Sequence, residues 1–326
     1  MKVSNLSVLC LGEILFDCLA DERGKKFEEV ESWTPYPGGA PANVACALVK
    51  LGTSAGFIGC VGEDEPGKQL TKLCEEIGVD VSGVQYHPSA PTRQIYVLRT
   101  DTGDREFAGF GDKQPDEFAD AFLDPDKLPI NLFATAEFLV IGTLELAFPQ
   151  TRLAVFRALE LAEQHGLKVV LDVNWRPMFW DDTEEALTLI KKLWAYVDFL
   201  KLSDEEAEWL FGTIDAGAIK YRLDSVEGVL VTAGEGNISY CLGENEGKLT
   251  SFSVEVEETT GAGDSFVAGL IHQLATKGIA GLKDAQIAKE VVTYACAVGA
   301  LTTTKPGAIA AQPTGVEVEE FLKSRY

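Results

Sequence analysis

The chain has 326 residues, of which 46% are hydrophobic and 24% charged, so it is long enough to bury a large core. Its formal net charge of -23 argues against nucleic acids and anionic membrane surfaces as partners. The seven cysteines form no C-x-x-C pair and the three histidines have no zinc spacing, so we expect reduced thiols, a cytoplasmic location and no structural zinc.

Apolar strands alternate with longer helical segments along most of the chain. This alternation predicts a three-layer α/β fold, in which a mostly parallel sheet is covered by helices on both faces. The predicted strands are residues 7–11, 55–60, 137–141, 168–173, 199–202, 228–232 and 239–242. The predicted helices are residues 42–51, 67–77, 150–165, 183–196, 205–211, 263–277, 284–301 and 316–324.

Two pairs of strand-like segments break this alternation. They flank the polar turns D-E-R-G-K-K and T-D-T-G-D, and glycine in the connection indicates β-hairpins. The strand-like segments are residues 14–20, 28–34, 93–99 and 105–110. We therefore predict one domain over residues 1–326, with a small β lid formed by residues 13–37 and 91–113.

The segment P-G-G-A-P-A-N, residues 37–43, precedes a predicted helix. Its glycines allow backbone groups to approach a ligand closely. The backbone and the amide of Asn43 could then bond to a sugar hydroxyl. Plain Pro/Gly loops are common, however, so this segment alone favours an ordinary loop.

The segment G-E-D-E-P-G-K-Q, residues 62–69, resembles the phosphate loop G-x-x-x-x-G-K-[ST]. Gln69 lacks the hydroxyl that holds Mg²⁺ in such a loop, and Glu63, Asp64 and Glu65 would repel phosphates. We interpret the segment as a loop that leads into a helix.

The segment D-V-N-W-R-P-M-F-W, residues 172–180, follows a predicted strand. Ligands bind at the carboxyl ends of strands in open α/β sheets. The planar guanidinium of Arg176 can bind two oxygens of a substrate or a phosphate. The alternatives are a surface ion pair for Arg176 and a packing role for the aromatic residues.

Two further segments follow predicted strands. In K-L-S-D-E-E-A-E, residues 201–208, Ser203 and Glu206 have the spacing of a capping box. A functional interpretation adds Glu206 as an organiser of Mg²⁺ through water. The segment V-T-A-G-E-G, residues 231–236, could cradle the phosphates and ribose of a nucleotide or could be a simple tight turn.

The segment E-T-T-G-A-G-D-S-F, residues 258–266, joins a β-rich stretch, 249–256, to an apolar helical run, 265–275. Unpaired N–H groups and the dipole at a helix start favour a phosphate. A carboxylate beside them, Asp264, can take a proton from a hydroxyl, as phosphoryl transfer to an alcohol requires. The alternative is a glycine turn with Asp264 as the N-cap.

Together, and in this order, these segments resemble the PfkB/ribokinase family of sugar and nucleoside kinases over nearly the whole chain. G-G-A-P-A-N (38–43) and T-T-G-A-G-D (259–264) look like the two signatures of the family. P-G-G-A-P-A-N-V-A, D-V-N-W-R-P and the closing K-P-G-A-I are most similar to fructokinases. The resemblance implies a ribokinase-like fold and an ATP-dependent kinase acting on the 6-hydroxyl of fructose, with ATP, Mg²⁺ and K⁺ as cofactors.

The resemblance also implies roles for individual residues. Asp264 would be the general base, Gly261, Ala262 and Gly263 would form the anion hole, and Arg176 would lie near the transferring phosphate or the sugar. The residues expected to hold or cover the sugar are Asp17, Gly38, Gly39, Asn43, Arg105 and Phe107. The residues expected at the nucleotide and its Mg²⁺ are Ser203, Glu206, Thr232, Gly234, Gly236 and Cys296.

The chain departs from the family pattern at several positions. Glu258 replaces an Asp that in the family helps to bind a monovalent cation, usually K⁺, and with Thr260 it marks the expected cation site here. Ser203 replaces an Asn, Asn237 a Gly and Ala310 a Pro. None of these changes removes the base or the anion hole.

Two alternatives to a fructokinase remain open from the sequence. The first is another acceptor, such as ribose, 2-keto-3-deoxygluconate or adenosine, which lid residues including Gln94 and Tyr96 would select. The second is a non-catalytic regulator that binds a sugar or nucleotide on the same fold. The exposed strand edges of the lid also predict a homodimer.

Overall fold

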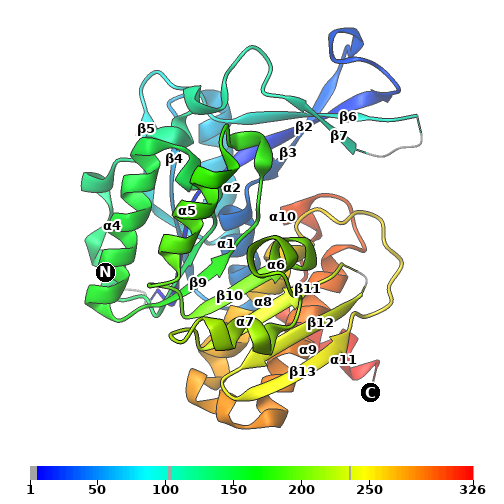
Figure 1. The fold of residues 1–326 in the computed structure, drawn as a ribbon. Helices are drawn as coiled ribbons and strands as arrows, with labels where there is room; N and C mark the ends of the chain where they lie inside the picture. Colours follow the sequence, from blue (N-terminus) through cyan, green and yellow to red (C-terminus); the bar gives the residue numbers. More distant parts are fainter. Residues whose placement is uncertain (1–5, 102–104, 235, 326) are drawn as a thin grey trace.

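The computed structural model describes residues 6–101, 105–234 and 236–325. Within these residues, nine strands form a large sheet (Figure 1). In spatial order they are β13 (Asn245–Thr250), β12 (Asn237–Leu242), β11 (Gly228–Thr232), β10 (Phe199–Ser203), β9 (Lys168–Asp172), β8 (Phe138–Ile141), β1 (Val8–Leu11), β4 (Ala55–Gly62) and β5 (Asp80–His87). The strands from β11 to β5 pair in parallel, and β12 and β13 pair antiparallel.

Helices cover both faces of the large sheet. One core contains side chains of α1 (Ala40–Leu51), α2 (Glu65–Ile77), α8 (Ala262–Lys277), α9 (Ala285–Thr302), α10 (Ala308–Ala311) and α11 (Gly315–Lys323). The other contains side chains of α3 (Ile130–Phe133), α4 (Pro149–His165), α5 (Thr183–Leu193), α6 (Asp204–Phe211) and α7 (Ala216–Arg222). The 3-10 helices are η1 (Phe27–Glu29), η2 (Pro115–Glu117), η3 (Ala119–Phe122), η4 (Pro125–Lys127), η5 (Leu144–Ala147), η6 (Pro177–Phe179) and η7 (Ile279–Lys283).

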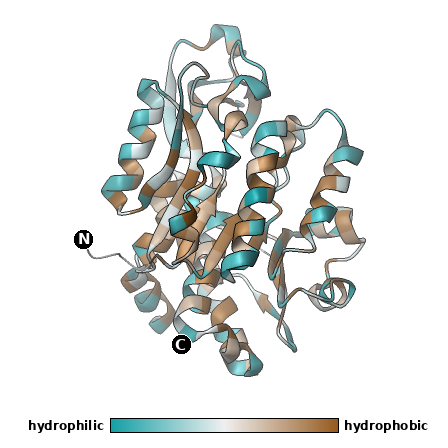
Figure 2. Ribbon diagram, turned by 90° about the vertical axis from the view of Figure 1, so that its left-hand side faces the viewer, coloured by the Kyte–Doolittle hydropathy of each residue, from teal (hydrophilic) through white to brown (hydrophobic). Residues whose placement is uncertain are grey.

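The strands explain why there are two cores. Successive side chains of a strand point to opposite faces, so Val8 and Cys10 of β1 join one core and Leu9 and Leu11 join the other. Figure 2 shows the same division, because the central strands are largely brown whereas the flanking helices alternate teal and brown along their turns. Within the described residues, no helix is long and apolar enough to cross a membrane.

A small sheet lies apart from the large one, at the upper right of Figure 1. Its strands, in spatial order, are β3 (Trp33–Gly38), β2 (Leu15–Arg23), β6 (Gln94–Arg99) and β7 (Arg105–Gly109). The pairs β2–β3 and β6–β7 are antiparallel, and β2 pairs in parallel with β6. The centre of the turn T-D-T-G-D, residues 102–104, lies outside the described residues.

The predicted fold class is confirmed: a mostly parallel sheet lies between two helical layers, and a small sheet accompanies it. Each strand and helix predicted in the α/β alternation is present, with bounds that shift by at most a few residues. The seven cysteines are free and buried, as expected for reduced core residues.

Two strand predictions are wrong. Residues 28–34 were expected to form the second strand of the first hairpin, but β3 occupies Trp33–Gly38 instead. Pro35 and Pro37 fit there because β3 is an edge strand, where a missing N–H breaks no ladder bond. The β-rich stretch 249–256 continues β13 only to Thr250, where its partner β12 reaches its first residue, Asn237.

The sequence pattern did not predict β5, α3, α7, α10 or most of β13. In β5 the run D-V-S-G-V-Q-Y-H mixes polar residues and a glycine, which obscures a strand signal. Gly83 permits close pairing with β4, since a Cβ there would lie 2.8 Å from Ile58 Cγ1. The strand is therefore specified by contact with its neighbour rather than by its own hydrophobic pattern.

A buried ion pair fixes the base of the small sheet. The guanidinium of Arg93, next to the start of β6, donates to both carboxylate oxygens of Asp120 in η3, at 2.6 and 2.7 Å. Four phenylalanine rings surround this guanidinium, with centroids 4.7 to 5.6 Å from Cζ. The side chains of Arg93 and Asp120 are only 0% and 4% exposed, so each charge depends on the other.

Arg93→Met should lower the free energy of unfolding by about 3–5 kcal/mol, because it leaves the Asp120 carboxylate buried without its cation. Urea unfolding followed by circular dichroism measures this loss. The matched control is Lys72→Met, which removes an exposed pair with Glu76 and should cost less than about 1 kcal/mol. Equal, small losses in both variants would contradict the role assigned to the buried pair.

Candidate active site

Two cavities meet at the loop that precedes α8. The first, of about 390 Å³, lies between the carboxyl ends of the parallel strands and the small sheet. The second, of about 290 Å³, lies between the β11–β12 edge and helices α8 and α9. Thr259 and Gly263 line both cavities, so a group bound at this loop can contact ligands on either side.

The structure gathers most of the predicted site residues around these cavities. Those that line the first cavity are Asp17, Gly39, Asn43, Phe107, Arg176, Thr260, Gly261, Gly263 and Asp264. Those that line the second are Thr232, Gly234, Ala262, Gly263 and Cys296. A third cavity, of about 560 Å³, is lined by Ser203 and Glu206 and shares Arg176 with the first.

Two of the predicted glycines lie next to the site but are not among the residues that line the two cavities. A Cβ at Gly38 would lie 2.7 Å from Asp17 Oδ2, so this glycine makes room for the carboxylate. The N–H of Gly236 donates to the Ala233 carbonyl at 2.7 Å within its turn. Among the described residues, Gly236 lines neither of the two cavities that meet at α8.

Asp264 is a partly buried carboxylate in the first turn of α8, and it lines the first cavity. Its Oδ2 accepts a hydrogen bond of 2.8 Å from Asn43 Nδ2 on α1. Burial raises the pKa of Asp264 to about 7, and nearby Asp172 adds to the rise, while the Asn43 bond, Lys201 and Arg176 oppose it. A carboxylate with this pKa is a competent proton acceptor near neutral pH.

The start of α8 excludes the interpretation of Asp264 as a helix cap. The N-cap is Gly261, whose φ of 78° is left-handed, and Asp264 lies three residues inside the helix. A Cβ at Gly261 would also lie 2.9 Å from the Ala308 Cβ. The chain therefore needs glycine at this position, and the side chain of Asp264 is free to serve the cavity.

Asp17, which lines the first cavity from the small sheet, is a second carboxylate with a raised pKa. Burial raises the pKa of Asp17 to about 6, while Arg105 and Arg176 oppose the rise. Its strand, β2, belongs to the small sheet, whereas Asp264 belongs to α8. The cavity thus has carboxylates on opposing elements, which suits a ligand rich in hydroxyl groups.

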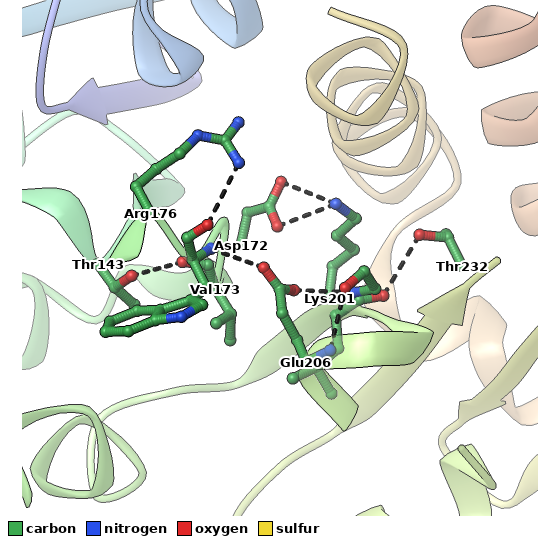
Figure 3. Close-up of polar contacts among 10 residues, drawn as sticks. Thr143, Asp172, Val173, Arg176, Lys201, Glu206 and Thr232 are labelled. Atoms are coloured by element: carbon green, nitrogen blue, oxygen red, sulfur yellow. Dashed lines mark hydrogen bonds and ion pairs between the residues drawn. The ribbon is translucent and has the colours of Figure 1, made fainter. Parts of the chain in front are cut away.

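A buried lysine next to the start of α8 carried no prediction from the sequence. Lys201 on β10 donates to both oxygens of Asp172, at 3.0 and 3.2 Å, and Figure 3 shows the ammonium directed at that carboxylate. A Cβ at Gly263 would lie 3.2 Å from Lys201 Nζ. The only available signal was a lysine inside an apolar strand, which is unusual without a partner.

The D-V-N-W-R-P segment contains a residue with a strained backbone conformation that lines the first cavity. Asn174 has a φ of 42°, a left-handed conformation that non-glycine residues adopt rarely. Arg176 Nη1 donates to the Trp175 carbonyl at 3.3 Å, and no ion pair of Arg176 occurs among the described residues (Figure 3). Its guanidinium therefore faces the cavities instead of forming the surface pair considered from the sequence.

Glu206 links the segment after β9 to the end of β10 through hydrogen bonds to backbone N–H groups. Its carboxylate accepts the N–H of Trp175 at 2.6 Å and that of Ser203 at 2.8 Å, and Ser203 Oγ accepts the N–H of Glu206 at 3.1 Å (Figure 3). The predicted capping box is confirmed. Burial raises the pKa of Glu206, and Asp172 adds to the rise while Lys201 opposes it.

The carboxylate of Glu206 in the third cavity fits a magnesium ion that arrives together with a phosphate ligand. Mg²⁺ keeps several waters and is usually bound through one or two carboxylates and substrate phosphates. Glu206 provides one such carboxylate beside Lys201. In the described part of the chain, no group of three or more His, Cys, Asp or Glu residues could hold a metal by itself.

A pair of buried carboxyl groups lies under the first cavity and was also missed. Glu13 lines the cavity, and its Oε1 accepts the N–H of Ala40, the first residue of α1, at 2.7 Å. Glu145 is fully buried against Glu13, and burial and this neighbour raise the pKa of Glu145 well above its usual range. Burial therefore favours the neutral form of Glu145, and Glu13 supports the start of α1 through its bond to Ala40.

The residues expected at the monovalent cation are bonded to another cation. Arg105 Nη2 lies 2.8 Å from Glu258 Oε1, and Arg105 Nη1 donates to Thr260 Oγ1 at 2.9 Å. The second oxygen of Glu258 accepts the N–H of Gly307 at 3.0 Å. Arg105, which was expected near the sugar, contacts the loop before α8.

The chain is similar to known proteins over nearly its whole length. The model of the pfkB family carbohydrate kinases matches residues 5–315. The chain is 36% identical over 319 residues to a probable fructokinase-2 of Arabidopsis thaliana, covering 97% of this chain and 95% of that protein. The fold matches a fructokinase with bound ATP from Xylella fastidiosa with a TM-score of 0.88, at 29% identity and 98% coverage of both chains. It also matches a double mutant of the Vibrio cholerae O395 fructokinase in a form with fructose, ADP and potassium bound, with a TM-score of 0.83, 26% identity and coverage of 99% and 100%.

Replacing Asp264 by Asn should stabilise the fold at high pH. The folded-state pKa of Asp264 is raised to about 7, so the folded chain loses stability as pH rises from the unfolded value toward 7. The neutral amide avoids this loss, and the advantage of Asp264→Asn over wild type should grow by about 2–4 kcal/mol between pH 4 and pH 8. Urea unfolding at both pH values measures the change.

The matched control for this prediction is Asp181→Asn, which removes an exposed carboxylate. Its difference from wild type should be nearly the same at both pH values. A pH-independent difference for Asp264→Asn would contradict the burial of a charged carboxylate at this position.

Proposed function

Because the chain belongs to the pfkB family of carbohydrate kinases, we propose that it transfers the γ-phosphoryl group of ATP to the 6-hydroxyl of fructose. The products are fructose 6-phosphate and ADP. The observation that carries the proposal is the position of Asp264, a partly buried carboxylate with a pKa near neutral, beside the loop at which two cavities meet. One cavity accommodates the acceptor and the other the nucleotide.

In this proposal Asp264 takes the proton of the 6-hydroxyl as the oxygen attacks the γ-phosphorus. The bond from that phosphorus to the β-γ bridging oxygen breaks, and ADP carries away the electron pair. Gly261, Ala262 and Gly263 would form the anion hole: the N–H groups of Gly261 and Gly263 would face the charge on the transferring group, as donors at a helix N-terminus can, while the Ala262 N–H donates to the Thr259 carbonyl at 3.2 Å. Lys201 and Arg176 would add positive charge on the same side.

Fructose is assigned to the first cavity. Asp17 and Asn43 offer an acceptor and a donor for its hydroxyls, with the backbone of Gly38 and Gly39 beside them. Phe107 of β7 lies over the same cavity from the small sheet. We propose that residues 13–37 and 91–113 act as a lid, which excludes water that would otherwise accept the phosphoryl group.

ATP is assigned to the second cavity. Thr232 and Gly234 would contact its ribose and phosphates, and Cys296 would pack against the adenine. Gly236 shapes the turn, and Ser203 positions Glu206, which would hold Mg²⁺ through water at the phosphates. When bound, the Mg²⁺ that accompanies ATP neutralises charge that develops on the phosphoryl oxygens.

The test is ADP release measured by a coupled assay over a panel of acceptors. Fructose should give the highest kcat/KM, above ribose, 2-keto-3-deoxygluconate and adenosine. A higher kcat/KM for one of these would change the acceptor and retain the chemistry. No turnover with any of them would contradict the proposal and favour a binding protein.

Asp264→Asn should lower kcat by about 10²- to 10⁴-fold, because general base catalysis contributes that much. The Kd for ATP, measured by isothermal titration calorimetry, should change little, since the amide keeps the size of the side chain. Asp181→Asn serves again as the control with unchanged kcat. Near-full activity of Asp264→Asn would exclude it as the base.

We also propose a homodimer formed through the small sheet and a cytoplasmic location. The edge strand β7 offers unpaired backbone groups, whereas Pro35 and Pro37 remove N–H groups from the other edge strand, β3, which instead presents the exposed aromatic ring of Tyr36. The seven buried free cysteines suit a reducing compartment.

Light scattering should give twice the 35.3 kDa mass of one chain. Tyr36→Glu should reduce the mass toward that of one chain, because it places a charge on the proposed interface. Tyr221→Glu, at an exposed tyrosine on α7, should leave the mass unchanged. A monomeric wild type at working concentration would contradict the dimer.

A further inference from the structure

An arginine of the small sheet reaches across to the loop that carries the anion hole. Arg105 is the first residue of β7, and its guanidinium bonds to Glu258 at 2.8 Å and to Thr260 at 2.9 Å. These two residues lie just before Gly261, the N-cap of α8. The contact thus links the proposed lid directly to the loop that would hold the transferring phosphoryl group.

The oxygens that a monovalent cation would use are already occupied. Glu258 Oε1 faces the guanidinium, Glu258 Oε2 accepts the Gly307 N–H at 3.0 Å, and the carboxylate is only 14% exposed. The hydroxyl of Thr260 accepts the second N–H group of Arg105. A K⁺ ion placed at the same oxygens would meet a fixed positive charge within a few ångströms, and like charges at that distance repel.

We infer that the Arg105 guanidinium supplies the positive charge that K⁺ supplies in related kinases, so that this chain works without a monovalent cation. The inference concerns the side chains of this protein and rests on the proposed kinase function. It differs from the expectation drawn from family resemblance, in which Glu258 and Thr260 mark a K⁺ site. The longer side chain of Glu258, compared with Asp, brings the carboxylate to both Arg105 and Gly307.

Arg105 lies on the same strand as Phe107, so the position of its positive charge depends on the position of the lid over the acceptor. Residues two apart on a strand point to the same face, so Arg105 and Phe107 face the same side of β7. Phe107 lines the fructose cavity, and Arg105 contacts the loop beside it. The positive charge therefore reaches the anion-hole loop when the lid covers the sugar, whereas a diffusible ion would be present with the lid open or closed.

The experiment compares KCl with tetramethylammonium chloride at equal ionic strength. Wild type should have the same kcat/KM for fructose in both salts, within about twofold. Arg105→Met should lose about fivefold in tetramethylammonium, the scale of one partly exposed ion pair, and should recover most of that loss in KCl. Arg105→Met should require K⁺ because the substitution leaves Glu258 without its positively charged partner.

Two further variants test whether the K⁺ activation of Arg105→Met depends on Arg105 itself and on the Glu258 carboxylate. Arg99→Met removes the arginine that pairs with Arg105 in the β6–β7 register, and Arg99 bonds to the carbonyls of Ala20 and Asp21 within the small sheet. This control should show no K⁺ activation. The double variant Arg105→Met/Glu258→Gln should also show none, because it lacks the carboxylate that K⁺ would neutralise.

A thermal-shift measurement tests the inference without catalysis. KCl, relative to tetramethylammonium chloride, should raise the Tm of Arg105→Met and leave the Tm of wild type and of the double variant unchanged. K⁺ activation of wild type by more than about fivefold, a K⁺-dependent rise in its Tm, or equal activation of wild type and Arg105→Met would overturn the inference. Absence of kinase activity with every acceptor would contradict the proposed function, and the Tm series would still decide the role of Arg105.

Discussion

The hydrogen bond from Asn43 to the partly buried carboxylate of Asp264 joins parts of the chain that are 221 residues apart. It ties the start of α1 to the start of α8, and Gln312 adds a bond of 2.8 Å to the carbonyl of Asn43. The carboxylate can remain desolvated only while these elements pack together. A raised pKa for Asp264 is thus a property of the whole fold, and the proposed base has its strength because tertiary packing excludes water from it.

Two glycines give this arrangement its sequence signature. Gly39 before α1 has a φ of 103°, and a Cβ there would lie 2.5 Å from the Glu13 carbonyl. Gly261 before α8 has a φ of 78° and faces Ala308 in the same way. Any other residue would be strained, and its Cβ would push the start of α1 away from Glu13 or the start of α8 away from Ala308. The motifs that point to phosphoryl transfer in the sequence are therefore the places where backbone must approach backbone.

Features set by local chemistry could be predicted, and features set by distant partners could not. The period of the strands, the capping box at Ser203 and the glycine-rich helix starts all lie within short windows of sequence. In contrast, the prolines of β3 are acceptable only because that strand is at a sheet edge. Arg105 and Thr260 are 155 residues apart, and nothing near either residue indicates their contact. Glu145 gave no signal, since an isolated glutamate in an apolar run reveals neither its burial nor its partner.

Because the whole chain is strongly negative, binding of an anionic nucleotide depends on positive groups at the site itself. A protein with a formal net charge of -23 repels a polyanion such as ATP at long range, so attraction must come from the site itself. Lys201 and Arg176 line the first and third cavities, and the start of α8 offers N–H groups between the first and second. The same burial that raises the pKa values of Asp17 and Asp264 toward neutrality also reduces the negative charge that an arriving phosphate meets. Desolvation therefore serves two requirements at once, a base strong enough to accept a proton and a site that an anion can enter.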